Sequence, residues 1–226
     1  MRFGPGGPAE PPDSQPVIRW SPDGTIDTLF QLPSNAAGNV TVRIGAGGAA
    51  AIGGGRRRAF LAQDQWTVTR DGRVAVVRAA PYHVEWIGAD GGRQAGPTVS
   101  YQPVRITQRD KEEWADRQTS GQMIMRTPQG ARTMRPSRPN LDEVDFPEFK
   151  PAFEGATIAP NGEVWVLVSR PASADRRAYD VFDAQGRRVR QVELAAGRRL
   201  VGFGNGTLYA VRVDEDDLQW LERYRL

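Results

Sequence analysis

The chain of 226 residues contains no cysteine and only one histidine. Without cysteine there can be no disulfide, no thiol nucleophile and no thiolate-bound zinc. No apolar run approaches the roughly 18 residues that a membrane-spanning helix needs, so we predict no membrane span. Met1 and Arg2 are followed by a Gly/Pro-rich run instead of an apolar segment, so no secretory signal peptide is visible in the chain as given.

Positive charge is carried almost entirely by arginine, because lysine occurs only at Lys111 and Lys150. The chain has 30 basic and 27 acidic residues, which leave a formal net charge of +3. Such a small and dispersed excess does not favour nucleic acid as a partner. With 39% hydrophobic residues, the chain is long enough to bury a core in one or two domains.

One pattern occurs three times along the chain. The dipeptides Asp71-Gly72, Asn161-Gly162 and Asn205-Gly206 each lie between two apolar stretches. This arrangement predicts β-hairpins with type I′ turns, which require positive φ at both central residues. The stretch after each turn shows no polar alternation, so we expect a strand covered on both faces. The last two turns are about 44 residues apart, a spacing typical of propeller blades.

The strand count indicates how much of a propeller is present. We predict two strands over 17–32, a four-stranded blade over 60–105, another over 153–195 and three strands over 198–226. The predicted fold class is all-β, a partial β-propeller of four-stranded antiparallel blades, with about three to three and a half blades. Because a ring needs at least about four blades, we expect the C-terminal portion of a larger propeller, with an open end that requires a partner.

Two segments depart from the repeat. Residues 1–16 are rich in Gly and Pro and predict a tail or linker before a propeller domain over 17–226. Residues 107–147 predict an insertion: "TQRDKEEWADRQ" favours a short surface helix pinned by Trp114, and the following residues favour a mobile basic loop without a hairpin. The alternative, a degenerate blade hidden within 107–147, remains open.

The sequence resembles a known group of propellers in its last two predicted blades. The runs "YDVFDAQGRRVRQVEL" and "RRLVGFGNGTLYAVRVDEDDLQWLERYRL", with "FPEFKPAF" before them, resemble bacterial six-bladed β-propeller proteins of the NHL and SMP-30-like superfamily. Many such proteins are exported, so the resemblance implies an exported or periplasmic protein. The same kind of propeller carries sugar-lactone hydrolases, lyases and interaction modules, so the resemblance specifies a fold and leaves the activity open.

Three charged residues occupy equivalent positions seven residues before the repeated turns. These residues are Asp64, Glu154 and Arg198. Innermost strands line a propeller's channel, so we expect these charges at its mouth, where two carboxylates could hold a divalent cation such as Ca²⁺ and Arg198 could orient an anion. The competing interpretation is that charged residues begin strands simply because they stay hydrated, with no metal and no cofactor.

The remaining chemistry is sparse. Four arginines of the insertion are candidate contacts for an acidic partner or phosphate, and these are Arg126, Arg132, Arg135 and Arg138. The sole histidine, His83, has no serine or carboxylate tied to it by a motif, so we expect a structural role. The acidic run from Asp214 to Asp217 lacks the ligand spacing of a calcium loop and predicts a solvated turn.

The sequence therefore predicts a non-catalytic binding or scaffold module. We expect protein contact, or self-association that completes the propeller. The alternative is a metal-dependent hydrolase or lyase of the lactonase-like propeller type, using Asp64 and Glu154 at the central channel. A third interpretation, a nucleic-acid contact through the basic loop, predicts binding that weakens steeply with salt.

Overall fold

The structure is a computed structural model whose described residues form two compact units. The first unit comprises 1–61 and 106–148, and the second comprises 62–105 and 149–226. The described residues are 14–33, 56–119 and 136–226, together with the backbone of the strands at 40–44, 50–54, 123–127 and 130–134. No helix among these residues is both long and apolar enough to cross a membrane.

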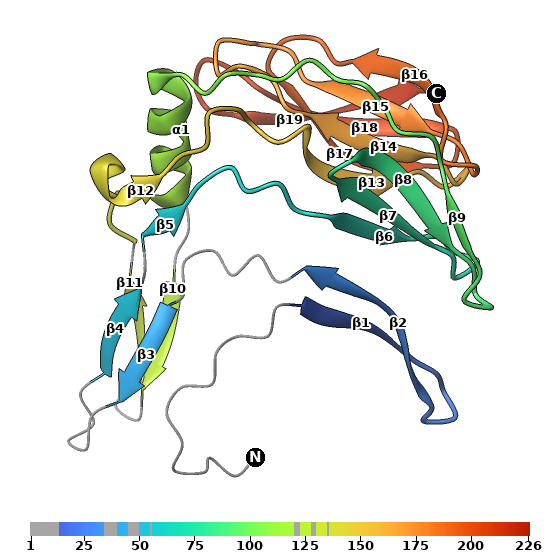
Figure 1. Ribbon diagram of the computed structural model, residues 1–226. Coiled ribbons are helices and arrows are strands. Elements are labelled where there is room, and N and C mark those ends of the chain that lie inside the picture. The colour runs from blue at the N-terminus through green and yellow to red at the C-terminus, as the bar shows by residue number, and fades with distance from the viewer. Residues whose placement is uncertain are drawn as a thin grey trace. The chain divides into compact units, whose positions relative to one another are not determined.

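The second unit consists of three antiparallel sheets, each a meander of sequential strands (Figure 1). The first sheet contains β6 (Gln65–Val68), β7 (Val74–Ala79), β8 (Tyr82–Ile87) and β9 (Arg93–Ala95). The second contains β13 (Phe153–Ile158), β14 (Val164–Val168), β15 (Ala178–Phe182) and β16 (Arg188–Glu193). The third contains β17 (Arg198–Gly204), β18 (Thr207–Val213) and β19 (Gln219–Arg225). The predicted strand pattern of four, four and three is confirmed, and the fold is all-β with the blade organisation of a partial propeller.

The hairpin turns lie where the sequence predicts them, but their geometry is different. At the first turn Gly72 N–H donates to Thr69 O at 3.1 Å and Thr69 N–H donates to Arg73 O at 2.9 Å. Gly72 has φ +83°, whereas Asp71 is not among the described residues with positive φ. The turn is therefore a type I turn followed by a left-handed glycine, and not the predicted type I′ turn. The Ala159 turn repeats this pattern, with Gly162 at φ +85°.

The first and second sheets pack face to face through one apolar cluster. Tyr82 lies at its centre, with its ring centroid 5.3 Å from Phe153 and 5.8 Å from Phe182. Val77, Val84, Val164 and Val166 are fully buried around it, and Trp86 and Ala75 are buried as well. Because the side chains of β7 and β14 alternate between two faces, this cluster takes only half of each strand.

The second and third sheets pack through another cluster on the opposite face of the second sheet. Trp165 lies at the centre of this cluster, with its ring centroid 5.1 Å from that of Phe203 and 6.1 Å from that of Tyr179. Leu208 and Ala210 of β18 are buried against it. The second sheet is thus enclosed on both sides, which is why the predicted two-face burial is confirmed for β14. In β18 only Leu208, Ala210 and Val211 are buried, so the prediction is confirmed for part of that strand.

A buried polar network also joins the first and second sheets. Asp180 is 2% exposed, and its carboxylate accepts hydrogen bonds from the Tyr82 hydroxyl at 3.1 Å and from Gln191 Nε2 at 2.9 Å. Arg188 Nη1 lies 3.5 Å from the same carboxylate. Burial raises the pKa of Tyr82, and the negative charge of Asp180 raises it further. These partners supply the hydrogen bonds that the buried Asp180 carboxylate needs, because a buried charge without them is costly. The Tyr82–Asp180 hydrogen bond also fixes the position of the first sheet against the second.

The first unit has more hairpins than the sequence predicts. The expected pair of strands near the start is confirmed as β1 (Ser14–Trp20) and β2 (Ile26–Pro33). A second hairpin contains β3 (Val40–Ile44) and β4 (Ala50–Gly54). β10 (Met123–Thr127) and β11 (Gly130–Met134) form a third hairpin within 107–147, where the sequence favoured a loop. The expectation of a loop without a hairpin was wrong. The two strands mix Met, Ile and Thr with arginine, so they do not show the apolar runs by which a hairpin is predicted from sequence.

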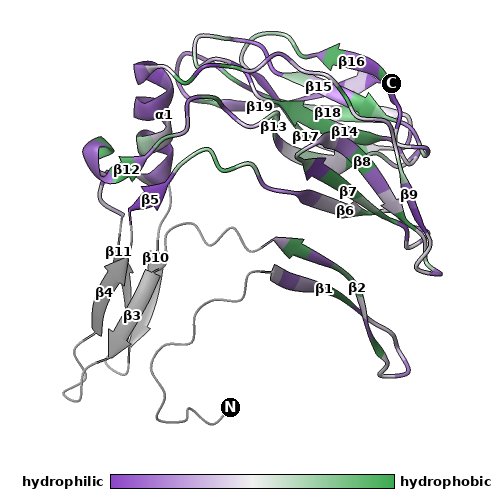
Figure 2. Ribbon diagram, viewed as in Figure 1, coloured by the Kyte–Doolittle hydropathy of each residue, from purple (hydrophilic) through white to green (hydrophobic). Residues whose placement is uncertain are grey.

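The predicted surface helix is confirmed as α1 (Gln108–Thr119), whose colouring in Figure 2 is mostly hydrophilic. Thr107 begins it, with its backbone N–H donating to the Asp110 carboxylate at 2.8 Å, a capping arrangement that satisfies an otherwise free N–H. Trp114 does pin the helix, since its ring packs at 84° and 5.6 Å against Phe146. Near Phe146 a short 3-10 helix η1 (Leu141–Glu143) leads into β12 (Val144–Asp145), which pairs in parallel with β5 (Arg57–Arg58).

Candidate functional site

The three predicted channel-mouth charges lie at or next to the starts of the first strands of their sheets, as their spacing suggests. Asp64 directly precedes β6, Glu154 is the second residue of β13, and Arg198 is the first residue of β17. In the described part of the chain, no hydrogen bond or ion pair joins any two of them. Their proposed role as a shared ligand site therefore remains a prediction that rests on position alone.

Two of these three charges have partners within their own sheets. Asp64 accepts from Arg78 Nη1 at 2.8 Å and from the Ala79 backbone N–H at 2.9 Å, so both of its carboxylate oxygens are occupied. Arg198 donates through Nε to Glu222 at 2.8 Å. Glu154 is exposed. Among the described residues, no group of three or more His, Asp or Glu side chains has the geometry to hold a metal ion.

The candidate arginines of the insertion fall in different places. Arg126 lies in β10 and Arg132 lies in β11, and only the backbone of these two strands is described. Arg135 lies outside the described residues. Arg138 is described, and its Nε lies 2.7 Å from Asp116 of α1. Its guanidinium is therefore engaged within the first unit.

The remaining polar residues singled out by sequence have structural contacts. His83 lies in β8 with its Nδ1 at 2.8 Å from the Pro81 carbonyl oxygen, an arrangement that suits an N–H donor. Asp214 closes the turn before β19 by accepting from the backbone N–H groups of Asp216 and Leu218 at 3.1 and 2.9 Å. The acidic run therefore forms a hydrogen-bonded turn, as the sequence predicts.

The third sheet ends at a strand whose outer edge has no neighbour among the described residues. β19 pairs with β18 over seven consecutive residues without a register shift, so it is a straight edge strand. Its side chains include the exposed residues Trp220, Leu221 and Tyr224, at 50%, 68% and 40% exposure. A long, straight and partly apolar edge is the kind of surface to which another strand adds.

The face of the third sheet that points away from the second sheet is apolar at its centre and basic around it. Val211 and Leu221 are cross-strand partners there, and Tyr209 pairs with Arg223. Arg199 and Arg225 occupy the same face by strand alternation and pairing. No acidic residue is on this face among its described positions, because Glu222 points to the opposite side with Arg198 and Arg212.

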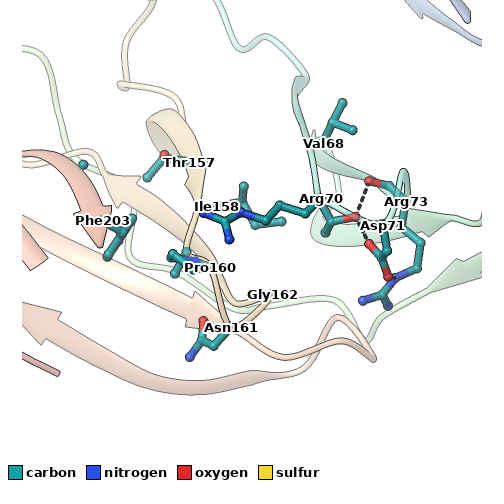
Figure 3. Close-up of a pocket in the computed structure, with 13 residues that line it drawn as sticks. Val68, Arg70, Asp71, Arg73, Thr157, Ile158, Pro160, Asn161, Gly162 and Phe203 are labelled. Carbon is teal, nitrogen blue, oxygen red and sulfur yellow. Dashed lines mark hydrogen bonds and ion pairs between the residues drawn. The ribbon is translucent and has the colours of Figure 1, made fainter. Parts of the chain in front are cut away.

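The sequence analysis missed a cavity at the other end of the first strands of these sheets (Figure 3). Its volume is about 470 Å³, and it lies between the β6–β7 turn, the β13–β14 turn and β17. Arg70, Asp71 and Arg73 form one wall, with Asn161 and Phe203 on the others. The repeated turns could have pointed to this place, because equivalent turns of neighbouring blades gather at one end of a propeller.

Comparison with known proteins gives only distant likenesses. No protein family model and no curated protein matches the chain. Among solved structures, a streptogramin B lyase structure matches with a TM-score of 0.27 and 13% identity, covering 95% of this chain and 76% of that one. Virginiamycin B lyase from Staphylococcus aureus matches with a TM-score of 0.21 and 13% identity, covering 95% and 85%. At TM-scores this low, the architecture rests on the chain's own sheets and not on these likenesses.

Proposed function

We propose that this chain is a non-catalytic binding and scaffold module of the propeller type, and that its contact surface is the open edge of β19. The observation that carries the proposal is the third sheet itself, which has three strands where its two neighbours have four. The resemblance of its strands to those of NHL and SMP-30-like proteins supports blades of the six-bladed type. The binding partner we propose is a second copy of the chain.

An antiparallel pairing of β19 with β19 of a second copy gives favourable cross-strand neighbours. With the twofold axis at Glu222, Trp220 of each copy lies opposite Tyr224 of the other, and aromatic cross-strand pairs stabilise sheets. Trp220 is already oriented for this, because its Nε1 donates to Asp214 at 2.6 Å and its ring lies 5.7 Å from the Arg212 guanidinium. Little side-chain freedom is then lost on pairing.

The charges of the third sheet favour its edge over its face. Stacking two copies face to face would bring Arg199, Arg223 and Arg225 of one copy against the same residues of the other, and this repulsion disfavours that arrangement. At the edge, the two Glu222 carboxylates that meet at the axis are each neutralised by Arg198 and Arg212, at 2.8 and 3.1 Å. The edge therefore has no uncompensated like charge on the axis.

The alternative, a metal-dependent hydrolase or lyase, has weaker support. It requires Asp64 as a ligand, yet Arg78 and the Ala79 N–H already occupy its two oxygens. The Arg78 guanidinium, 2.8 Å from the Asp64 carboxylate, neutralises its charge and would repel a cation bound to it. Loss of an activity on treatment with a chelator would favour this alternative.

The mass of the chain in solution, measured by light scattering during gel filtration, tests the proposal. We expect a dimer at micromolar concentration, and a monomer for Leu221→Lys, because each Lys would then face Arg223 of the other copy. Val189→Lys is the matched control, since Val189 is an exposed apolar residue (49%) of the edge strand β16. A monomeric wild-type chain, or a dimer that survives Leu221→Lys, would contradict the proposal.

A further inference from the structure

We infer that the cavity between the repeated turns of the second unit binds a small organic anion, a carboxylate carried on a flat apolar body. The cavity volume of about 470 Å³ falls within the roughly 300 to 1,000 Å³ typical of small-molecule sites. All of its walls belong to the second unit. This inference is independent of the contact proposed for β19, which lies on other residues.

The cationic group that would hold the anion is Arg70. Its side chain extends from the β6–β7 turn into the cavity, toward Ile158 and Pro160 of the facing turn (Figure 3). No hydrogen bond or ion pair in the described part of the chain engages its guanidinium. A guanidinium presents two parallel N–H groups that match the two oxygens of a carboxylate. Among the residues that the structure describes, Arg70 is thus a donor without an acceptor, and it lies at the wall of the cavity.

The carboxylate in the wall, Asp71, does not compete for Arg70. One oxygen of Asp71 accepts from the Thr69 hydroxyl, and the other accepts from Arg73 Nε at 2.9 Å. The Thr69 hydrogen bond, followed by that of Arg73, lowers the pKa of Asp71 below its ordinary value. Asp71 is therefore ionised near neutral pH, and its charge is balanced by Arg73, which leaves the charge of Arg70 uncompensated.

Arg73 belongs to the wall but is held in place. Its guanidinium lies 4.9 Å from the centre of the Trp86 ring, and Nη2 lies 3.9 Å from the position that a Cβ on Gly162 would occupy. It thus reaches from the turn of the first sheet toward the turn of the second. Since one of the two arginines is balanced by Asp71, the site carries a single net positive charge, which matches a monoanion.

The rest of the wall suits the apolar part of the ligand. Phe203 and Ile158 line it, and the Phe203 ring is held by Trp165 in an edge-to-face contact at 61°. Asn161 also lines the cavity, but its side chain is engaged with Glu163, because its Oδ1 accepts from the Glu163 backbone N–H at 3.2 Å and its amide hydrogen-bonds to the Glu163 carboxylate. One uncompensated cationic group beside the apolar side chains of Phe203 and Ile158 suits an aromatic carboxylate better than a sugar or a metal ion.

Titration calorimetry of the full chain with naphthoate tests this inference, with naphthamide as the uncharged ligand of the same shape. We expect saturable binding of naphthoate at one site, and an affinity for naphthamide that is lower by about tenfold or more, because the amide forfeits a charge-assisted bidentate pair. Arg70→Gln should lower the affinity for naphthoate to that for naphthamide while leaving naphthamide binding unchanged. Arg70 is exposed, so this variant is expected to fold normally.

Two further variants make the outcome specific. Arg176→Gln removes an exposed arginine of the same unit that does not line the cavity, and should leave both affinities unchanged. Leu221→Lys, which tests the β19 contact, should also bind naphthoate normally, so the two proposals can fail separately. Undetectable naphthoate binding, equal affinity for the amide, or an unaffected Arg70→Gln variant would each overturn the inference.

Discussion

Two buried tyrosines allow the polar contacts at the two sheet interfaces to be compared directly. Tyr82 donates its hydroxyl hydrogen bond to the carboxylate of Asp180 at 3.1 Å, between the first and second sheets. The hydroxyl of Tyr179 accepts a hydrogen bond from the Leu200 backbone N–H at 3.3 Å, between the second and third. Replacing either residue with phenylalanine removes one oxygen and keeps the ring, so the apolar clusters are preserved in both variants.

The structure predicts different losses for the two variants. Asp180 is 2% exposed, and without Tyr82 its Oδ2 would keep only the long contact of 3.5 Å to Arg188. Hydrogen bonds to charged groups contribute about 1.5 to 3 kcal/mol, and neutral ones about 0.5 to 1.5 kcal/mol. We therefore expect Tyr82→Phe to lower the free energy of unfolding by about 2 kcal/mol and Tyr179→Phe by about 1 kcal/mol.

Urea unfolding followed by tryptophan fluorescence measures both losses, because Trp86 and Trp165 are buried in the two apolar clusters. The pH dependence provides a second readout. The pKa of Tyr82 is raised in the fold, so its contribution to stability is complete below the unfolded value of about 10 and is lost as the pH rises above it. The wild type should therefore lose stability more steeply above pH ~10 than Tyr82→Phe. Equal losses for the two variants would refute the reasoning.

Other predictions follow from close contacts and ion pairs of the same unit. A Cβ at Gly96 would lie 2.2 Å from the Gly186 carbonyl oxygen, so Gly96→Ala should destabilise by about 1 to 3 kcal/mol in thermal unfolding, whereas Gly155→Ala, with nothing within 4 Å, should not. Arg190 lowers the pKa of Glu163, so the stability from this pair is complete above pH ~4.3 and is lost as the pH falls through the lowered folded pKa. Glu163→Gln should flatten the acid limb of a stability profile by less than about 1 kcal/mol, and an unchanged acid limb would contradict this.

Local sequence patterns were sufficient to predict most elements of the second unit. An Asx-Gly pair between apolar runs places a hairpin turn within a residue or two. In the first unit, the charged and helix-forming residues after Thr107 likewise predict the helix at Gln108–Thr119. The same patterns do not fix the turn type, because Asp71 and Asn161 suit both the expected type I′ turn and the observed type I turn with a left-handed glycine. That choice depends on the register of the flanking strands.

Long-range features escaped prediction for physical reasons. The parallel pairing of Arg57 with Val144 joins residues far apart in sequence, and no local signal specifies it. The candidate site shows the same limit. Spacing correctly placed Asp64 and Arg198 at strand starts, but their partners Arg78 and Glu222 lie on later strands, and only the fold reveals that these charges are already paired.

The third sheet shows what an apolar strand implies when its coverage is incomplete. β14 and the central part of β18, Leu208–Val211, are both apolar, yet β14 is enclosed by sheets on both faces and β18 on one. On the outer face, Val211 of β18 pairs with Leu221 of β19, which is 68% exposed. β19 is an edge strand and has two further exposed aromatic side chains, Trp220 and Tyr224. Exposed apolar surface that adjoins a free hydrogen-bonding edge is costly for an isolated chain and favours association. Because the arginines of the outer face would repel a second copy there, we propose the edge of β19 as the place where two copies associate.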